Sequence, residues 1–79
     1  MDLFNEIKEM IVDRFSVDDS DVVADAHLQD DLGADSLAIL YLAEAIAKKY
    51  GIELPGDDLV EIENVAELVE LVESRIAEK

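Results

Sequence analysis

Asp31-Leu32-Gly33-Ala34-Asp35-Ser36-Leu37 marks the point in this chain where an acidic loop ends and an apolar helix begins. Asp and Ser are among the preferred residues at helix N-caps, so Asp35 is a candidate cap and the Ser36 hydroxyl is expected on an exposed first turn. The free N–H groups and the dipole at a helix N-terminus favour an anion. Ser36 is therefore a candidate for covalent attachment of a phosphate-bearing group, although an ordinary N-cap explains the Asp-Ser dipeptide equally well.

The helix after this boundary is predicted from about Ser36 to Tyr50, with Gly51 as its left-handed C-cap residue. At about 100° per residue, its buried face contains Ile39, Leu42, Ala43, Ile46 and Tyr50. Outside that face lie the side chains that we expect to contact a partner: Leu37, Leu40, Tyr41, Glu44 and Lys48. Folding does not require an outward Leu and Tyr, which favours a contact surface.

Towards the N-terminus, apolar residues recur at three- and four-residue steps, which predicts an amphipathic helix over residues 3–15 with Asp2 as its N-cap. Residues 16–35 have no such periodicity. A loop of roughly this length tends to be functional or disordered in a compact domain. Its isolated apolar residues indicate that it is anchored to a core: Val22, Val23, Leu28 and Leu32.

Towards the C-terminus, Pro55 and Gly56 interrupt the helical pattern, and Asp57 to Ile62 form at most a short helix. The last helix is predicted to begin at Asn64, because Glu67 three residues later completes a capping box. Its buried stripe comprises Val65, Leu68, Val69, Val72 and Ile76. The predicted fold is an all-α bundle of three main helices plus one short helix, with a long loop between helices 1 and 2, and residues 1–79 form one domain.

The composition is strongly acidic, with 21 Asp and Glu against 6 Lys and Arg and a net charge of −15. Such a field repels nucleic acid and anionic membrane surfaces and attracts basic protein patches. The longest apolar run, residues 37–43, is too short for a membrane span, and no secretory signal pattern is visible. We therefore expect a cytoplasmic monomer that does not bind nucleic acid.

Catalytic and metal-binding functions find little support in the sequence. The spacing of the aspartates between residues 18 and 31 does not match an EF-hand loop, and the chain has no cysteine. His27 stands alone and is expected to be an exposed loop residue rather than a metal ligand. Ser36 has no companion base and there is no glycine-rich phosphate loop. We predict no metal site and no enzymatic activity.

The run Leu32-Gly33-Ala34-Asp35-Ser36-Leu37 resembles the phosphopantetheine attachment motif of acyl carrier proteins. The resemblance extends over essentially the whole chain, including a Glu53-Leu54-Pro55 break before the short helix. It implies that Ser36 carries a 4′-phosphopantetheine arm, transferred from coenzyme A by a phosphopantetheinyl transferase. Asp35 and Leu37 flank the attachment site, and Asp35 is a candidate to help hold a metal ion in the transferase.

The same resemblance implies how such a carrier works. Acyl intermediates are held as thioesters on the arm and presented to acyl-transferring and chain-elongating synthase enzymes of fatty-acid, polyketide or related lipid biosynthesis. The acyl chain lies in an apolar cleft between the second and third helices. The residues that match this cleft are Leu28, Ile39, Ala43, Ile46, Leu59, Ile62 and Leu68.

One departure from the family concerns charge. Typical fatty-acid carriers display several acids on the exposed side of the second helix, whereas here Glu44 is its only acid and Lys48 and Lys49 follow. Two interpretations stay open. Either the chain is a specialised carrier with a restricted set of partners, or Glu44 and Lys48 form a helical i,i+4 pair on a solvated face.

Two other functions also stay open. A peptidyl or amino-acyl carrier usually has a Gly-Gly-His/Asp-Ser pattern, whereas this chain has Gly33-Ala34-Asp35-Ser36, which favours acyl cargo. The other alternative is an acidic helical protein-interaction module without a prosthetic group. Loading with phosphopantetheine separates that module from every carrier.

Overall fold

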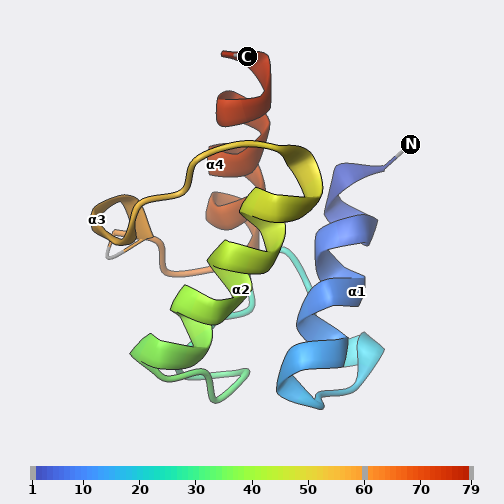
Figure 1. Cartoon of the computed structure of the whole chain (residues 1–79). Helices are drawn as coiled ribbons and strands as arrows, with labels where there is room; N and C mark the ends of the chain where they lie inside the picture. The colour runs from blue at the N-terminus through green and yellow to red at the C-terminus, as the bar shows by residue number, and fades with distance from the viewer. Residues whose placement is uncertain (1, 60, 79) are drawn as a thin grey trace.

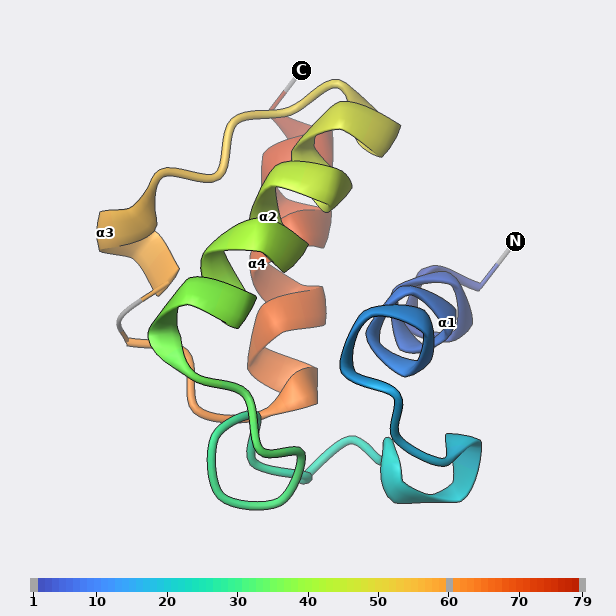
Figure 2. The same ribbon diagram turned by 60° about the horizontal axis from the view of Figure 1, so that its bottom comes forward.

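The computed structural model describes residues 2–59 and 61–78 and is built from helices. Their order is α1 (Leu3–Phe15), the 3-10 turn η1 (Asp19–Asp21), α2 (Ser36–Tyr50), α3 (Gly56–Leu59) and α4 (Val65–Ala77). Helices α1, α2 and α4 pack together, while α3 lies on the flank of α2 away from α1 (Figure 1). The predicted all-α bundle, with its long loop between the first two main helices, is confirmed (Figure 2).

Side-chain caps begin the main helices where the sequence predicted them. The Asp2 carboxylate accepts a hydrogen bond of 3.1 Å from the Phe4 N–H. At the start of α4, Asn64 Oδ1 accepts from the Glu67 N–H at 2.9 Å, and Glu67 Oε1 accepts in return from the Asn64 N–H at 3.4 Å. These bonds satisfy N–H groups that a helix cannot pair internally. The predicted helix starts are therefore confirmed.

The core lies where α1, α2, α4 and the long loop meet. Its most deeply buried side chains come from all four segments: Ile7, Ile11, Val22, Leu28, Leu42, Ile46, Val65, Leu68 and Val72. Burial of each such side chain contributes about 1.5–3 kcal/mol relative to leaving it exposed. Three predictions need correction. Tyr50 and Val69 are only partly buried, and Ile76, in the last turn of α4, is 36% exposed.

The long loop between α1 and α2 is held by backbone hydrogen bonds to the segment that begins α4. The Leu28 N–H donates to the Glu63 carbonyl at 3.0 Å, and the Val65 N–H donates to the Ala26 carbonyl at 3.1 Å. An isolated antiparallel bridge between His27 and Asn64 belongs to the same pairing. The predicted anchoring is confirmed for Val22, Leu28 and Leu32, which are buried, but not for Val23, which is 47% exposed.

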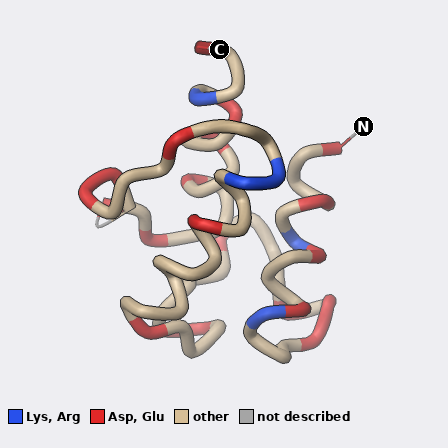
Figure 3. Tube along the Cα trace, viewed as in Figure 1, with Lys and Arg blue, Asp and Glu red and all other residues tan. Residues whose placement is uncertain are grey.

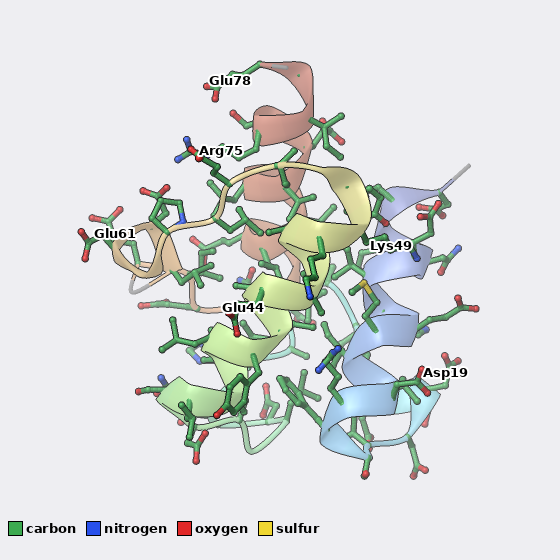
Figure 4. The ribbon with its side chains drawn as sticks, viewed as in Figure 1. Asp19, Glu44, Lys49, Glu61, Arg75 and Glu78 are labelled. Carbon is green, nitrogen blue, oxygen red and sulfur yellow. The ribbon has the colours of Figure 1, made fainter. Side chains whose placement is uncertain are left out.

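Helix α3 is shorter than the predicted helix from Asp57 to Ile62. It begins at Gly56, directly after Pro55, whose carbonyl accepts from the Asp58 N–H at 3.0 Å. It ends at Leu59, and Ile62 lies beyond it in a turn; residue 60 lies outside the described residues. Arg75 of α4 forms an ion pair with Asp58, which connects α4 to α3 (Figure 4).

Candidate functional site

Ser36 is the first residue of α2, and its side chain is exposed. The cap of this helix is Asp35, as predicted: its Oδ1 accepts from the Ala38 N–H at 2.8 Å, and its carbonyl accepts from the Ile39 N–H at 3.1 Å. Because Asp35 supplies the cap, the Ser36 hydroxyl is not needed to begin the helix. It is available for chemistry.

The residues before the cap hold Ser36 in a defined position. Leu32 and Ala34 are buried, and the Ala34 N–H donates to the Leu28 carbonyl at 2.9 Å. Gly33, between them, has a φ of +69°, a backbone conformation that side-chain-bearing residues rarely adopt. The loop therefore turns sharply between two anchored residues and delivers Ser36 to the surface.

A cavity of about 360 Å³ opens between the start of α2 and α3. Its lining residues are Gln29, Ser36, Ile39, Leu40, Gly56, Asp57, Leu59 and Ile62. The volume falls within the range of roughly 300–1,000 Å³ that is usual for small-molecule sites, and the wall is mostly apolar, as such sites are. A group attached to Ser36 therefore begins at the wall of a cavity that can receive an apolar chain.

The structure brings only part of the predicted cleft to this cavity. Ile39, Leu59 and Ile62 line it, whereas Leu28, Ala43, Ile46 and Leu68 are buried in the core and do not. The reason is position along the helix: Ile39 lies in the first turn of α2 beside α3, while Ala43 and Ile46 lie one and two turns further on.

Four lining residues were not predicted for the cleft. Leu40 was assigned to the partner face, and Gln29, Gly56 and Asp57 were not assigned to any site. For Leu40 the helical periodicity had indicated only a position outside the buried face of α2. For Gln29 no signal existed, because its contact with this cavity depends on how the loop folds beneath α2.

The N-terminus of α2 suits a phosphodiester on Ser36. The side chain and carbonyl of Asp35 satisfy the N–H groups of Ala38 and Ile39, whereas those of Ser36 and Leu37 find no acceptor among the described residues. Free N–H groups at a helix N-terminus favour an anion. Phosphopantetheine would supply a flexible arm ending in a thiol, and its phosphate fits this position.

The predicted partner face is exposed in full: Leu37, Leu40, Tyr41, Glu44 and Lys48. Along α2 the charges are one acid in the middle and two lysines at the C-terminal end (Figure 3). No ion pair joins Glu44 to Lys48 within the part of the chain that the structure describes. The interpretation of these two residues as a helical i,i+4 ion pair is therefore wrong.

Within residues 2–59 and 61–78, no group of three or more His, Cys, Asp or Glu is arranged to hold a metal ion. His27, expected to be exposed, is only partly so, with Nδ1 3.5 Å from Asp30 Oδ2 and Nε2 4.0 Å from Glu63 Oε2. None of the described helices is long and apolar enough to cross a membrane.

The structure is thus a helical bundle that presents a serine at the start of its second helix, beside a mostly apolar cavity. Residues 5–72 match the family described as phosphopantetheine attachment site, and the chain belongs to that family. Members of this family are modified covalently with phosphopantetheine and are not catalysts themselves.

The structure is also similar to the solution structure of the 3,7-dioxo-octyl actinorhodin acyl carrier protein from Streptomyces coelicolor. The TM-score is 0.82 and the sequence identity is 25%, over 95% of this chain and 91% of the other. This likeness supports the acyl-carrier fold and, together with the family match, an acyl-carrier-like function.

Proposed function

We propose that Ser36 is the attachment residue and that the protein carries acyl intermediates as thioesters on a 4′-phosphopantetheine arm. The observation that carries the proposal is the position of Ser36, which is exposed at the first residue of α2 and lines a mostly apolar cavity. The partner enzymes of this carrier are acyl-transferring and chain-elongating synthases of fatty-acid, polyketide or related lipid biosynthesis. The arm comes from coenzyme A through a phosphopantetheinyl transferase.

Recognition by the transferase depends on the neighbours of Ser36. Leu37 projects into solvent directly beside the serine, which suits an apolar contact with the enzyme. Asp35 Oδ1 accepts the capping hydrogen bond from the Ala38 N–H, so this side chain fixes the start of α2 and with it the position of Ser36. We propose that its remaining oxygen faces the transferase and helps hold the enzyme's metal ion.

The direct test is intact mass after incubation with coenzyme A and a promiscuous phosphopantetheinyl transferase. We expect the wild type to gain one arm and Ser36→Ala to gain none. Ser74→Ala is the matched control, because Ser74 is an exposed serine within α4 and its replacement leaves the α2 terminus intact. Loading of Ser36→Ala, or no loading of the wild type, would overturn the assignment; the latter would favour an interaction module without a prosthetic group.

For the cargo, we propose a chain that bears oxo groups. Among the lining residues, Gln29 offers an amide that can donate a hydrogen bond to a ketone oxygen, whereas the carboxylate of Asp57 can only accept. The similar carrier from Streptomyces coelicolor bears a 3,7-dioxo-octyl group. Both observations support a partly oxidised chain over a fully reduced one.

The cargo is tested by loading octanoyl and 3-oxo-octanoyl arms onto Ser36 and comparing the melting temperatures. We expect the oxo chain to raise the melting temperature more than the saturated chain does. Gln29→Leu should remove that difference while leaving the effect of the saturated chain intact. Equal stabilisation by both chains in the wild type would contradict the proposal and favour fatty-acid cargo.

The remaining expectations concern the whole molecule. The cytoplasmic location, the monomeric state and the extent of the domain over residues 1–79 stay predictions.

A peptidyl or amino-acyl cargo is the main alternative within the class of carrier proteins. The mostly aliphatic cavity wall, formed by Ile39, Leu40, Leu59 and Ile62, supports an acyl chain over a polar aminoacyl group.

A further inference from the structure

Helix α3 and the turn after it form one side of the cavity beside Ser36. The facing side comes from the first turns of α2, through Ile39 and Leu40. The position of α3 relative to α2 therefore sets the width of the cavity. The residues that this segment contributes to the lining are Gly56, Asp57, Leu59 and Ile62.

The backbone of α3 is not fixed to the rest of the molecule. Its four residues are far fewer than the about 12–15 at which an isolated helix becomes even marginally stable. In the part of residues 53–62 that the structure describes, the backbone hydrogen bonds stay within the segment. The Asp58 N–H donates to the Pro55 carbonyl at 3.0 Å, and the Ile62 N–H donates to the Leu59 carbonyl at 3.1 Å. Figure 2 shows α3 lying outside the group formed by the main helices, so side chains must hold it in place.

The side chains that hold α3 are of two kinds. Leu59 is buried, and Leu54 and Ile62 are partly buried against the core. The polar contact is an ion pair in which Nη2 of Arg75, in α4, donates a hydrogen bond to Oδ2 of Asp58. No other ion pair joins the described residues of 53–62 to another element. Asp58 does not line the cavity, so the ion pair holds α3 without entering the space beside Ser36.

Arg75 also separates carboxylates that belong to two different elements. Its Nη1 lies 3.8 Å from Oε2 of Glu78, the C-cap residue of α4, while its Nη2 binds Asp58 (Figure 4). Without this cation, an acidic segment would face Glu78 directly, and like charges repel. Residues 53–61 contain no Lys or Arg, and their acids are Glu53, Asp57, Asp58 and Glu61.

We propose that Arg75 is a positioning residue for the cargo: through Asp58 it holds α3 against the bundle and keeps the acyl chain covered in the cavity. The proposal rests on the carrier function proposed above. When the ion pair breaks, α3 moves away from α2 and the thioester on the arm becomes accessible to water and to small nucleophiles. Both side chains are about one third exposed, so the ion pair contributes modestly to holding α3 in place.

The first measurement is amide hydrogen exchange in the unmodified protein, which does not depend on loading. In Asp58→Asn we expect the Ile62 N–H to exchange about two- to fivefold faster, the change that loss of a partly exposed ion pair produces. The Val65 N–H, which pairs with the long loop, should exchange as in the wild type. Arg75→Gln should have the larger effect, because it leaves Asp58 and Glu78 without a cation between them.

Glu78→Gln is the matched control. It makes the same change in net charge as Asp58→Asn and removes the other partner of Arg75, but it leaves the ion pair to α3 intact. Exchange at Ile62 should then stay at the wild-type rate. Asp58→Glu keeps a carboxylate at this position and should restore most of the protection. Equal exchange at Ile62 in Asp58→Asn and Glu78→Gln would overturn the proposal.

The second measurement uses the arm at Ser36 loaded with an octanoyl or an acetyl group. Hydroxylamine attacks the thioester carbonyl, which forms a hydroxamate and releases the thiol of the arm. We expect Asp58→Asn to speed cleavage of the octanoyl thioester about two- to fivefold and to leave the acetyl thioester unchanged. The acetyl group offers the cavity little apolar surface, so its exposure does not depend on α3. Equal acceleration of both chains, or of neither, would contradict the positioning role.

The two measurements separate this proposal from the carrier function. If the wild type takes no arm from coenzyme A, the carrier function is wrong, and exchange at Ile62 still decides whether Asp58 holds α3. If the wild type is loaded but Asp58→Asn changes neither exchange nor cleavage, the role of Arg75 alone is wrong. Faster exchange without faster cleavage of the octanoyl thioester would show that α3 does not cover the cargo, which also overturns the proposal.

Discussion

A Cβ atom placed on Gly56 would lie 3.3 Å from Cδ2 of Leu40. The first residue of α3 thus packs closely against a side chain of α2, and both residues line the cavity beside Ser36. A side chain larger than hydrogen at position 56 would press on Leu40. The width of the cavity therefore depends on the smallest possible residue at this point.

Gly56→Ala should narrow the cavity without unfolding the protein. Gly56 does not have a positive φ, so alanine fits its backbone, and we expect the free energy of unfolding to change by less than about 1 kcal/mol. The acyl chain should be less well covered, so the thioester of loaded protein should hydrolyse faster. Leu40→Ala in the same chain should restore the slower rate. An unchanged hydrolysis rate in Gly56→Ala would show that the chain does not enter this cavity.

Ile46→Ala should destabilise the fold far more than Leu40→Ala. Ile46 is fully buried in the core, so its truncation leaves a cavity and is expected to cost about 2–5 kcal/mol. Leu40 is 42% exposed, so its truncation should cost much less. Urea unfolding followed by circular dichroism measures both. Comparable losses would mean that Ile46 faces a cleft that opens readily, as the family resemblance implied.

Asn64→Ala should weaken the start of α4. The variant loses the side-chain half of the capping box, and such replacements cost about 1 kcal/mol. Ser74→Ala, a change to alanine at an exposed position within the same helix, is the control and should have little effect on the urea midpoint. No loss in Asn64→Ala would show that the backbone bonds of Leu28 and Val65 hold this terminus without the cap.

Tyr50 should make stability depend on pH in the alkaline range. Burial, together with the hydrogen bond of 2.7 Å that its hydroxyl donates to the Glu6 carboxylate, raises its pKa from 10.0 to about 12. The folded state holds this proton more tightly than the unfolded state. The stabilisation is therefore complete below pH 10 and is lost as the pH rises towards about 12.

The measurement uses Tyr41→Phe, which leaves Tyr50 as the only tyrosine in the chain. At a pH midway between the pKa of Tyr50 in the unfolded protein and its pKa in the folded protein, phenolate absorbance should show Tyr50 mostly protonated. After denaturation at the same pH, Tyr50 should be mostly ionised. Tyr50→Phe should remove the corresponding loss of melting temperature. A midpoint near 10 in the folded protein would contradict the role of Glu6.

The helices and the place of Ser36 at the start of α2 were predictable from the sequence because their signals are local. Apolar spacing over a few turns indicates α1, α2 and α4, and Asp35 and Asn64 cap the helices that they precede in the chain. The position of Ser36 on the first turn follows from the same cap. Each of these signals comes from residues within a few turns of one another in the chain.

Tertiary structure alone decided which side chains meet around Ser36. Gln29 reaches the cavity because hydrogen bonds to the start of α4 fold the loop beneath α2, and Arg14 reaches Tyr41 because α1 packs beside α2. Ile46 shares the apolar face of Ile39 but lies two turns away from α3, so it belongs to the core. Periodicity determines which face of a helix is buried, whereas the identity of its neighbours depends on segments that are distant in the chain.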